Sequence, residues 1–301
     1  EAIRWGRKAG KLRVAVAEVN DQMPTIFGNN WLHVSEFDWF VENSSKIPAP
    51  PRPTPGEVEK KVGDHVLELI NDGDTIQMGI GGIPEAVVAG LDGRKDLGVL
   101  TELFPIGLQN LTAKGIGTNE RKPFHKGITV ATFCVGDQAM YDYVDHNPAC
   151  EFYPASYTNN PAFIAQHPNV VAINMALMVD FSGQIASEGI GHHQVSGTGG
   201  QLDFVRGAAR SVGGQSFLCL HSTRRDPATG ATTSTIVLDL PPGTPVTTPR
   251  TDVMNVVTEY GVAELFCRPI EERVHAMIAI AHPDFREQLT RDAVAAGLIR
   301  S

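Results

Sequence analysis

A strand, loop and helix pattern between residues 74 and 104 constrains the fold more than any other part of the chain. Two short apolar runs, Thr75–Met78 and Leu97–Leu100, have the composition of buried parallel strands. The first leads into the glycine-rich turn Gly79–Pro84, and the second leads directly into Glu102. In an open α/β sheet, the carboxyl ends of neighbouring strands border one crevice in which ligands bind. The pattern therefore predicts a loop of backbone amides and a carboxylate that face each other across one site.

The remainder of the chain alternates between apolar runs and amphipathic helical patterns. Further strands are expected at Ile128–Phe133, Val170–Asn174, Ser216–Leu220, Thr235–Leu238 and Val253–Thr258. Helices are expected at Gly56–Asn71, Asp137–Asp145, Glu271–Ile280 and Pro283–Leu298. This alternation predicts an α/β fold in which a mostly parallel open sheet carries helices on both faces.

A proline-rich run, Pro48–Pro55, divides the chain. No helix or central strand tolerates this density of proline, so we interpret residues 48–55 as an extended linker. Residues 1–47 then form a separate preceding part, and residues 56–301 form the principal domain. Before the linker, Lys11–Asn20 has the pattern of an interior strand with almost nothing ahead of it to pair with. We therefore expect that an N-terminal portion is missing.

The bulk composition excludes several classes of partner. The chain has 301 residues and a net charge of −9, which argues against nonspecific binding to nucleic acid or to an anionic membrane. The net charge does not exclude an anionic small molecule as a ligand, because local amides and a few arginines can outweigh a distant net charge. No apolar run reaches transmembrane length, and the four scattered cysteines lack metal-ligand spacing. We expect buried free thiols and a cytoplasmic location.

The first glycine loop and Glu102 each allow two interpretations. The loop is either a tight connection or an anion site, because Pro84 in the first turn of a helix leaves the preceding amides free. Glu102 is either a solvated carboxylate at the end of a strand or one held in an apolar crevice. Desolvation in such a crevice would make the carboxylate a stronger nucleophile or base.

A second glycine cluster occupies residues 196–208, with the sequence SGTGGQLDFVRGA. Its glycines let the backbone approach a ligand closely, and a run of free amides forms an anion-binding nest. Arg206 could pair with Asp203 or with a phosphate group, and the pairing with Asp203 is favoured.

Two other polar groups are weaker candidates. Glu259 follows an apolar run and is expected to be structural, although it could form part of a site wall. His192 and His193 are adjacent, and adjacent side chains on a strand point in opposite directions, so we expect no metal site there.

Taken together, these segments resemble the acetyl-CoA hydrolase/transferase family of class I CoA-transferases, especially its 4-hydroxybutyrate and butyrate–acetate CoA-transferase branch. The similar stretches occur in family order over nearly all of residues 14–290. They are VAEVNDQMPTIFG, GIGGIPEAV, DLGVLTELF, YDYVDHNP, YPASYTNNP, SGQIASEGIG, SGTGGQLDFVRGA, VVTEYGVAEL and IAHPDFREQL. The family has two related α/β halves. The resemblance implies a complete C-terminal half and only the end of the N-terminal half, residues 1–47.

The resemblance also assigns roles to residues of the site. Glu102 matches the catalytic glutamate, and the amide of Ile80 matches a donor of the oxyanion hole. The positions that match CoA-binding or site-lining residues are Gly79, Gly81, Gly82, Asn174, Gly197, Gly199, Gly200 and Glu259. The chain departs from the family at Pro105-Ile106, where a Ser-Asp pair is more usual. This departure bears on the acyl preference and, to a lesser degree, on transferase activity itself.

The implied reaction moves CoA between an acyl-CoA and a short-chain carboxylate such as acetate, butyrate or 4-hydroxybutyrate. Glu102 would form an acyl-glutamyl anhydride and then a glutamyl-CoA thioester. The implied substrates are CoA and acyl-CoA, with no permanently bound cofactor and no metal. The resemblance also implies a homodimer. An acyl-CoA hydrolase is the alternative. A noncatalytic CoA-binding subunit, which would need the missing half, is the alternative from another class.

Overall fold

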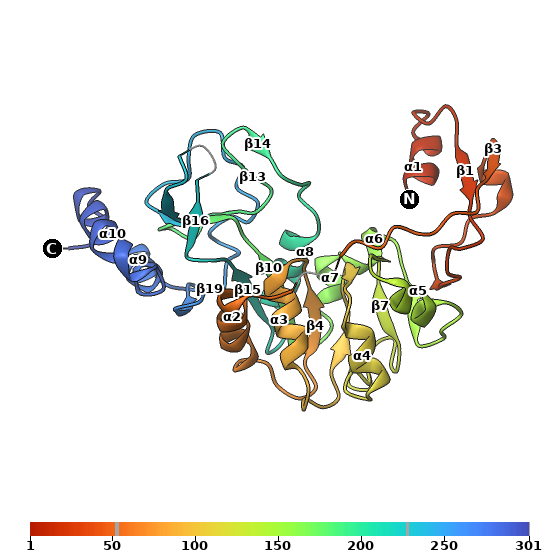
Figure 1. Ribbon diagram of the computed structural model, residues 1–301, viewed down its shortest axis with the longest axis horizontal. Coiled ribbons are helices and arrows are strands. Elements are labelled where there is room, and N and C mark those ends of the chain that lie inside the picture. Colours follow the sequence, from red (N-terminus) through yellow and green to blue (C-terminus); the bar gives the residue numbers. More distant parts are fainter. Residues whose placement is uncertain (52–53, 227–228, 301) are drawn as a thin grey trace.

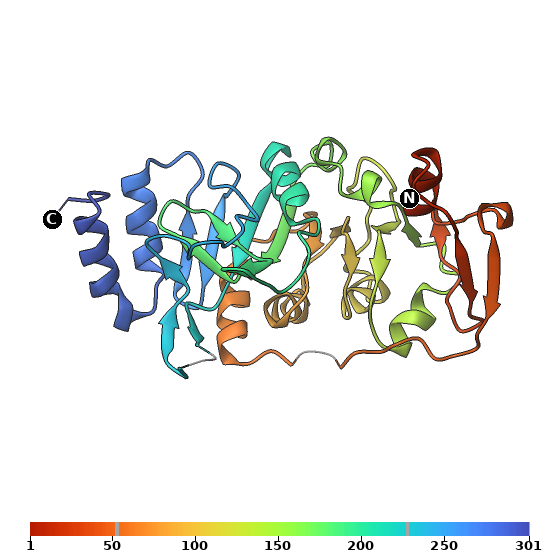
Figure 2. The same ribbon diagram turned by 90° about the horizontal axis from the view of Figure 1, so that it is seen from above.

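The computed structural model describes residues 1–51, 54–226 and 229–300. The molecule is elongated, with the N-terminal segment at one end and the C-terminal helices at the other (Figures 1 and 2). Between them lies the largest sheet of the described residues, in the strand order β20-β19-β15-β10-β4-β5. Its strands are β4 (Thr75–Met78), β5 (Gly98–Val99), β10 (Val170–Met175), β15 (Gln215–Cys219), β19 (Asn255–Thr258) and β20 (Gly261–Glu264). All pairs are parallel except β19 with β20, which confirms the mostly parallel sheet.

Helices cover both faces of this sheet, as predicted. The alternating side chains of β10 show the division. Val171 and Ile173 join the core beneath α2 and α3, whereas Val170 and Ala172 join the core beneath α8. The helices are α1 (Ala2–Lys8), α2 (Glu57–Leu67), α3 (Gly82–Gly90), α4 (Leu108–Ala113), α5 (Gln138–Val144), α6 (Ala155–Thr158), α7 (Pro161–Ile164), α8 (Gln201–Arg210), α9 (Ile270–Ala279) and α10 (Pro283–Ala295). A strand buried on both faces explains the continuous apolar runs in the sequence.

Beyond β5, the architecture continues into smaller parallel sheets. Leu100 forms a bridge to Val130, which lies in the sheet β2-β9-β7, and β6 pairs with β8. These strands are β2 (Phe27–Gly28), β6 (Leu103–Phe104), β7 (Thr129–Ala131), β8 (Phe133–Cys134) and β9 (Cys150–Phe152). The single strand expected at residues 128–133 is therefore two strands, interrupted at Thr132. The amides of Thr132 and Phe133 both donate to the carbonyl of Glu102, which fixes the main chain at that residue.

Short strands complete the C-terminal part. They are β11 (Met178–Asp180), β12 (Ile185–Ala186), β13 (Gly189–Ile190), β14 (His193–Gln194), β16 (Thr223–Arg225), β17 (Thr232–Ser234) and β18 (Ile236–Val237). The strand expected at Thr235–Leu238 is thus confirmed in its central residues, and it pairs with β11. The antiparallel pair β13 and β14 leads directly to the second glycine cluster, so it positions the start of that loop.

A strand is present within Lys11–Asn20, as expected, but it is short and its side chains are largely exposed in the described part of the chain. Only Val16–Val19 form a strand (β1), which pairs with β3 (Trp39–Glu42) in a sheet of these two strands. The side chains of both strands are largely exposed, and Trp39 has a relative exposure of 67%. The apolar composition suggested burial, but no element of the described residues covers either face of this pair. The short helix η1 (Val34–Glu36) lies between the two strands in sequence.

The structure bears on two expectations drawn from composition, one about membrane-spanning segments and one about buried thiols. No helix in the described part of the chain is long and apolar enough to span a membrane. The four cysteines are unpaired, and Cys150 and Cys219 are buried as expected. Cys267 is exposed, so the expectation of buried thiols is wrong for that residue. It follows the last strand of the main sheet, outside the packed core.

A buried lysine makes stability depend on pH near neutrality. Lys122 is 1% exposed, and its Nζ donates to the carbonyls of Val99 (3.0 Å) and Ile128 (2.6 Å). Burial lowers the pKa of Lys122 to about 7 from its usual 10.5. Between these two pH values the unfolded chain binds this proton and the folded chain does not. Stability from this group therefore rises with pH across that window and falls as the pH drops toward 7.

Replacing Lys122 by methionine is expected to remove this pH dependence. The difference in free energy of unfolding between wild type and Lys122→Met should change in favour of the wild type from pH 7 to pH 8.5. Denaturant titrations at the two pH values measure it, and using the difference cancels the titration of other groups. Parallel curves for the two proteins would show that Lys122 keeps an ordinary pKa in the folded state.

Candidate active site

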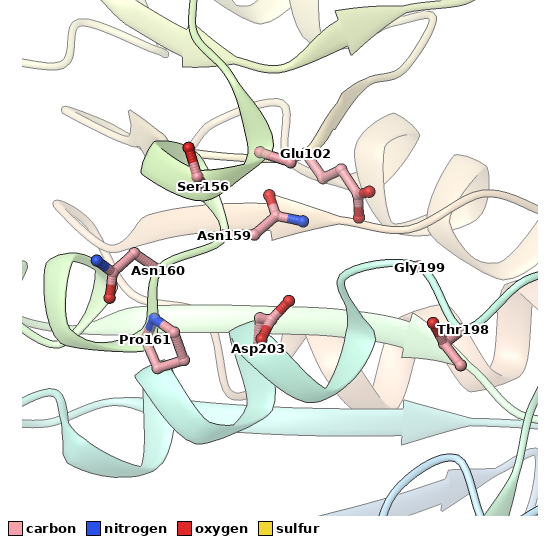
Figure 3. Close-up of a pocket in the computed structure, with 9 residues that line it drawn as sticks. Glu102, Ser156, Asn159, Asn160, Pro161, Thr198, Gly199 and Asp203 are labelled. Atoms are coloured by element: carbon pink, nitrogen blue, oxygen red, sulfur yellow. The ribbon is translucent and has the colours of Figure 1, made fainter. Parts of the chain in front are cut away.

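Glu102 lies at the carboxyl edge of the sheet, between β5 and β6. Its Oε2 atom accepts a hydrogen bond of 2.8 Å from the amide of Gly200, a residue 98 positions away. Gly200 is the N-cap residue of α8, so the carboxylate lies at the positive end of a helix. Figure 3 shows the carboxylate of Glu102 pointing toward the loop that carries Gly199. The fold thus joins the sequence-predicted glutamate to the second glycine cluster.

A polar cavity of about 510 Å³ surrounds this carboxylate. Its walls come from the segment around α6 and α7, from the loop before α8, and from the first turn of α8 (Figure 3). The lining residues are Glu102, Ala155, Ser156, Asn159, Asn160, Pro161, Thr198, Gly199 and Asp203. Amide, hydroxyl and carboxyl groups therefore line the space beside Glu102, which suits a polar ligand.

Asn159 is held so that its amide nitrogen faces Glu102. The hydroxyl of Thr158 donates to Asn159 Oδ1 at 2.9 Å, and the hydroxyls of Thr158 and Thr132 are hydrogen-bonded to each other. The Nδ2 atom is then the free donor. A Cβ atom placed on Gly200 would lie 2.4 Å from this Nδ2 and 2.3 Å from Glu102 Oε2. The two side chains therefore converge on the Cα of Gly200.

Asp203 lines the same cavity, and the charge of Glu102 affects its pKa. Burial, and then the nearby Glu102, raise the pKa of Asp203, whereas Arg206 lowers it. The expected pairing of Arg206 with Asp203 is nevertheless wrong. Arg206 forms two parallel hydrogen bonds of 3.2 Å to Asp252, the fork geometry that suits a guanidinium and a carboxylate. The carboxyl group of Asp203 is left facing the cavity (Figure 3).

The first glycine loop borders a different, smaller cavity. Gly79, Ile80 and Gly81 line a space of about 170 Å³ together with Leu103, Pro105 and Ile106. Thr101 joins the two strand ends, because its hydroxyl accepts from the amide of Met78 at 3.3 Å and donates to the carbonyl of Leu103 at 2.8 Å. The strand ends are thus adjacent as expected. In the described contacts, however, the Glu102 carboxylate is bonded to Gly200 and not to residues 79–82.

The conformation of this loop depends on its glycines. The amide of Gly79 donates to Ile173 (2.8 Å), so it is already occupied. Gly81 has φ +126°, and a Cβ atom there would lie 2.2 Å from the sulfur of Met175. Gly82 begins α3. Between them, the side chain of Ile80 is 73% exposed. The loop is therefore held against β10 while its tip faces outward.

The remaining residues that were predicted for the site lie in different environments. Asn174 exchanges two amide hydrogen bonds with Gln77, of 3.1 and 2.9 Å, beside Gly79. Glu259 accepts from the amide of Ser222 at 2.9 Å and from its hydroxyl. Gly197 lies in an exposed loop with open space around its Cα. Asn174 supports the first loop, whereas Glu259 anchors another turn and does not line the cavity around Glu102.

The histidine pair has no partners of the kind that a metal centre requires. Within residues 1–51, 54–226 and 229–300, no cluster of at least three His, Cys, Asp or Glu side chains could hold a metal ion. His192 lies against Gly243 and His193 pairs across the hairpin with Ile190.

Comparison with known proteins decides the family. The model of the "Acetyl-CoA hydrolase/transferase C-terminal domain" matches residues 136–293, which is more than half of the chain. The chain belongs to the acetyl-CoA hydrolase/transferase family. This confirms the resemblance that the motifs indicated.

Similar members of this acetyl-CoA hydrolase/transferase family are longer than the chain. The 4-hydroxybutyrate coenzyme A transferase of Clostridium kluyveri is 42% identical over 94% of the chain and 65% of the relative. The butyryl-CoA:acetate CoA-transferase of Anaerostipes caccae is 40% identical over 96% and 66%. The crystal structure of RipA from Yersinia pestis has a TM-score of 0.89 at 40% identity and covers 98% of the chain and 66% of that protein. Proteins named acetyl-CoA hydrolase are more distant, at 25% and 27% identity. The chain thus spans about 65% of the length of such relatives.

Two residues that line the Glu102 cavity, Ser156 and Asn159, are not predicted by the sequence analysis. Both lie in the stretch YPASYTNNP, which carries part of the resemblance to the family. The signal that could have identified Asn159 is the pair of asparagines directly after a hydroxyl residue at the end of a short helix. Asp203 was noticed, but as the partner of Arg206. Its placement beside Glu102 follows from the start of α8.

Proposed function

We propose that this chain carries the catalytic glutamate of a CoA-transferase, which moves CoA between a short-chain acyl-CoA and a free carboxylate. The observation that supports it most is the Glu102 carboxylate, held by the Gly200 amide in a polar cavity beside the donor side chain of Asn159. The names of the relatives at 40% identity or more agree with transfer rather than hydrolysis.

The reaction proceeds through two covalent intermediates on Glu102. A carboxylate oxygen attacks the thioester carbonyl carbon, its electron pair forms the new C–O bond, and the C–S bond breaks to release CoA thiolate. The product is an acyl-glutamyl anhydride. The thiolate then attacks the glutamyl carbonyl carbon, which expels the acyl group as a carboxylate and leaves a glutamyl-CoA thioester. A second carboxylate reverses these steps.

Preorganised donors stabilise the negative oxygen that develops at each step. The candidates are the Gly200 amide, Asn159 Nδ2 and the Ile80 amide at the tip of the first loop. In the structure, the Gly200 amide donates to the Glu102 carboxylate itself. It becomes available to substrate oxygen when Glu102 turns toward the thioester. Every nucleophile arrives ionised, so the sequence of steps needs no general base, and CoA is a substrate rather than a resident cofactor.

The arrangement of the whole protein forms part of the same proposal. Residues 1–47 are the end of an N-terminal half, residues 48–55 the linker, and residues 56–301 the C-terminal half. The complete protein works as a homodimer. The four unpaired thiols support a reducing compartment, and we assign the protein to the cytoplasm.

One exchange experiment tests the reaction. The chain is incubated with acetyl-CoA, with and without butyrate, and acyl-CoA products are followed by mass spectrometry. New butyryl-CoA supports transfer. Free CoA that forms without an acceptor supports the hydrolase alternative. No reaction in either arm, with Glu102→Ala indistinguishable from wild type, would leave a noncatalytic CoA-binding subunit.

Replacing Asn159 by alanine is expected to slow exchange about 10²–10³-fold, because one donor to the developing oxyanion is lost. Asn159→Asp should be slower still, since it keeps the shape but places a second negative charge beside Glu102. Steady-state rates of butyryl-CoA formation measure both. Equal rates for wild type and both variants would exclude Asn159 as a donor. Thermal unfolding of each variant serves as the control for folding.

A further inference from the structure

The small cavity beside the first glycine loop has a lining unlike that of the Glu102 cavity. It measures about 170 Å³ and lies between the end of β4 and the segment that follows Glu102. The lining residues are Pro50, Pro51, Gly79, Ile80, Gly81, Pro84, Glu85, Leu103, Pro105, Ile106 and Val135. Most are aliphatic side chains or prolines. A proline carries no amide hydrogen, so the four prolines offer a ligand no main-chain donor.

The size of the cavity limits what it can hold. It is smaller than the roughly 300–1,000 Å³ of pockets for drug-sized ligands. Apolar cavities of about 150 Å³ hold a benzene-sized molecule. A saturated group of up to about six carbons is therefore the largest occupant that fits without rearrangement.

The cavity is bordered by the first glycine loop and by the residue that follows Glu102. One wall is the main chain of Gly79–Gly81, which contains the Ile80 amide of the proposed oxyanion hole. The opposite wall begins at Leu103, the residue directly after Glu102. Thr101 ties these two walls together, because its hydroxyl accepts from the Met78 amide and donates to the Leu103 carbonyl. An acyl carbonyl that reaches both Glu102 and the loop would thus direct its hydrocarbon tail into this space.

We propose that this cavity is the acyl pocket and that it selects unsubstituted acyl groups of up to about six carbons over ω-hydroxylated and dicarboxylic ones. The inference rests on the proposed function, because the acyl group belongs to the same reaction. Pro105 and Ile106, where the sequence departs from the pattern usual in the family, supply the apolar wall opposite the loop.

The selectivity follows from the cost of burying polar groups. A substrate hydroxyl in this cavity would lose water, and the one polar side chain of the described lining, Glu85, is already engaged in another interaction. Such a difference is worth about 10²-fold in specificity. A second carboxylate would be disfavoured further. Among the described residues that line the cavity, none is a lysine, arginine or histidine, and Glu85 adds a carboxyl group to the wall.

The test compares matched substrates in wild type and in three variants at two positions of the cavity wall. The exchange assay gives kcat/KM for butyrate, 4-hydroxybutyrate, succinate and hexanoate as acceptors of CoA from acetyl-CoA. Butyrate should exceed 4-hydroxybutyrate by about a hundredfold. Ile106→Ser and Val135→Asn should narrow this ratio about tenfold or more, because they supply a hydrogen-bond partner. Val135→Phe should fill the pocket and reduce kcat/KM for hexanoate about tenfold more than kcat/KM for butyrate.

Matched controls distinguish a change in selectivity from a loss of folding. A binding measurement distinguishes it from failure of the proposed function. Ile106 is buried, so the Val135 variants, at a side chain with 44% exposure, repeat the test at lower risk to stability. Val212→Ser and Val212→Phe make comparable changes at an 81% exposed position outside the cavity and should leave the ratios unchanged. Calorimetry with the unreactive thioethers S-butyl-CoA and S-(4-hydroxybutyl)-CoA reports the preference without turnover.

The outcomes separate the two proposals. Exchange with ratios that stay within twofold across all Ile106 and Val135 variants would overturn the acyl pocket and leave the CoA-transferase proposal intact. A binding preference for S-butyl-CoA that the variants narrow, without any exchange, would support the pocket and overturn the transferase. Equal binding of both thioethers, or no binding at all, would also overturn the pocket.

Discussion

Replacing Glu102 by alanine is expected to reduce CoA exchange on the order of 10⁴–10⁶-fold, the range seen when a catalytic residue that works as part of a unit is removed. Without its carboxylate, neither the anhydride nor the glutamyl-CoA thioester can form. The rate of butyryl-CoA formation from acetyl-CoA and butyrate measures the loss. Because Glu102 accepts a hydrogen bond at the N-terminus of α8, removal should also cost about 0.5–2 kcal/mol of stability, as loss of an N-cap side chain does.

Glu102→Gln separates these two effects. The amide oxygen of glutamine can still accept from Gly200, so stability should stay near that of wild type while exchange is lost. Borohydride treatment during turnover should reduce the glutamyl-CoA thioester to an alcohol, and peptide mass spectrometry should find that change at residue 102 in the wild type alone. A Glu102→Gln variant that exchanges CoA at the wild-type rate would contradict the assignment of the nucleophile.

The sequence predicted most strands of the main sheet, but neither β20 nor the direction of the Glu102 side chain. Runs such as Val170–Asn174 are buried on both faces, and that double burial is what their continuous apolar composition encodes. Glu102 could be placed at a strand end for the same reason. The hydrogen bond that orients its carboxylate comes from Gly200, 98 residues away, and no local pattern reports such a contact.

The other differences also arise from long-range contacts. Arg206 could reach Asp203 within its own helix, but Asp252, near the start of β19, offers two parallel hydrogen bonds. The run at Lys11–Asn20 has the composition of a buried strand, yet its burial depends on elements that must cover it. The amide of Asn159 is oriented by the hydroxyl of the adjacent Thr158, which is itself hydrogen-bonded to Thr132, 26 residues away. Each case turns on a partner that is distant in sequence.

Gly200→Ala is expected to lower exchange at least about 10²–10³-fold, the effect of losing one oxyanion donor. Its φ of −93° is open to any residue, so the effect is one of space and not of backbone strain. The new Cβ would lie 2.3 Å from Glu102 Oε2 and 2.4 Å from Asn159 Nδ2, and both side chains must move. The exchange assay measures the effect of displacing the Glu102 and Asn159 side chains, and thermal unfolding of the same variant measures any accompanying loss of stability.

The neighbouring glycine provides the matched comparison, because it has the opposite properties. Gly199 has φ +56° and no atom within 4 Å of an added Cβ. Gly199→Ala should therefore cost about 1–2 kcal/mol of stability through left-handed backbone strain and slow exchange much less than Gly200→Ala does. If contact with Glu102 causes the Gly200 effect, the stability cost of Gly200→Ala should shrink in a Glu102→Ala background, as a double-mutant cycle would measure. An unchanged cost in that background would mean that the new methyl group does not meet the carboxylate, and that Glu102 has another resting position.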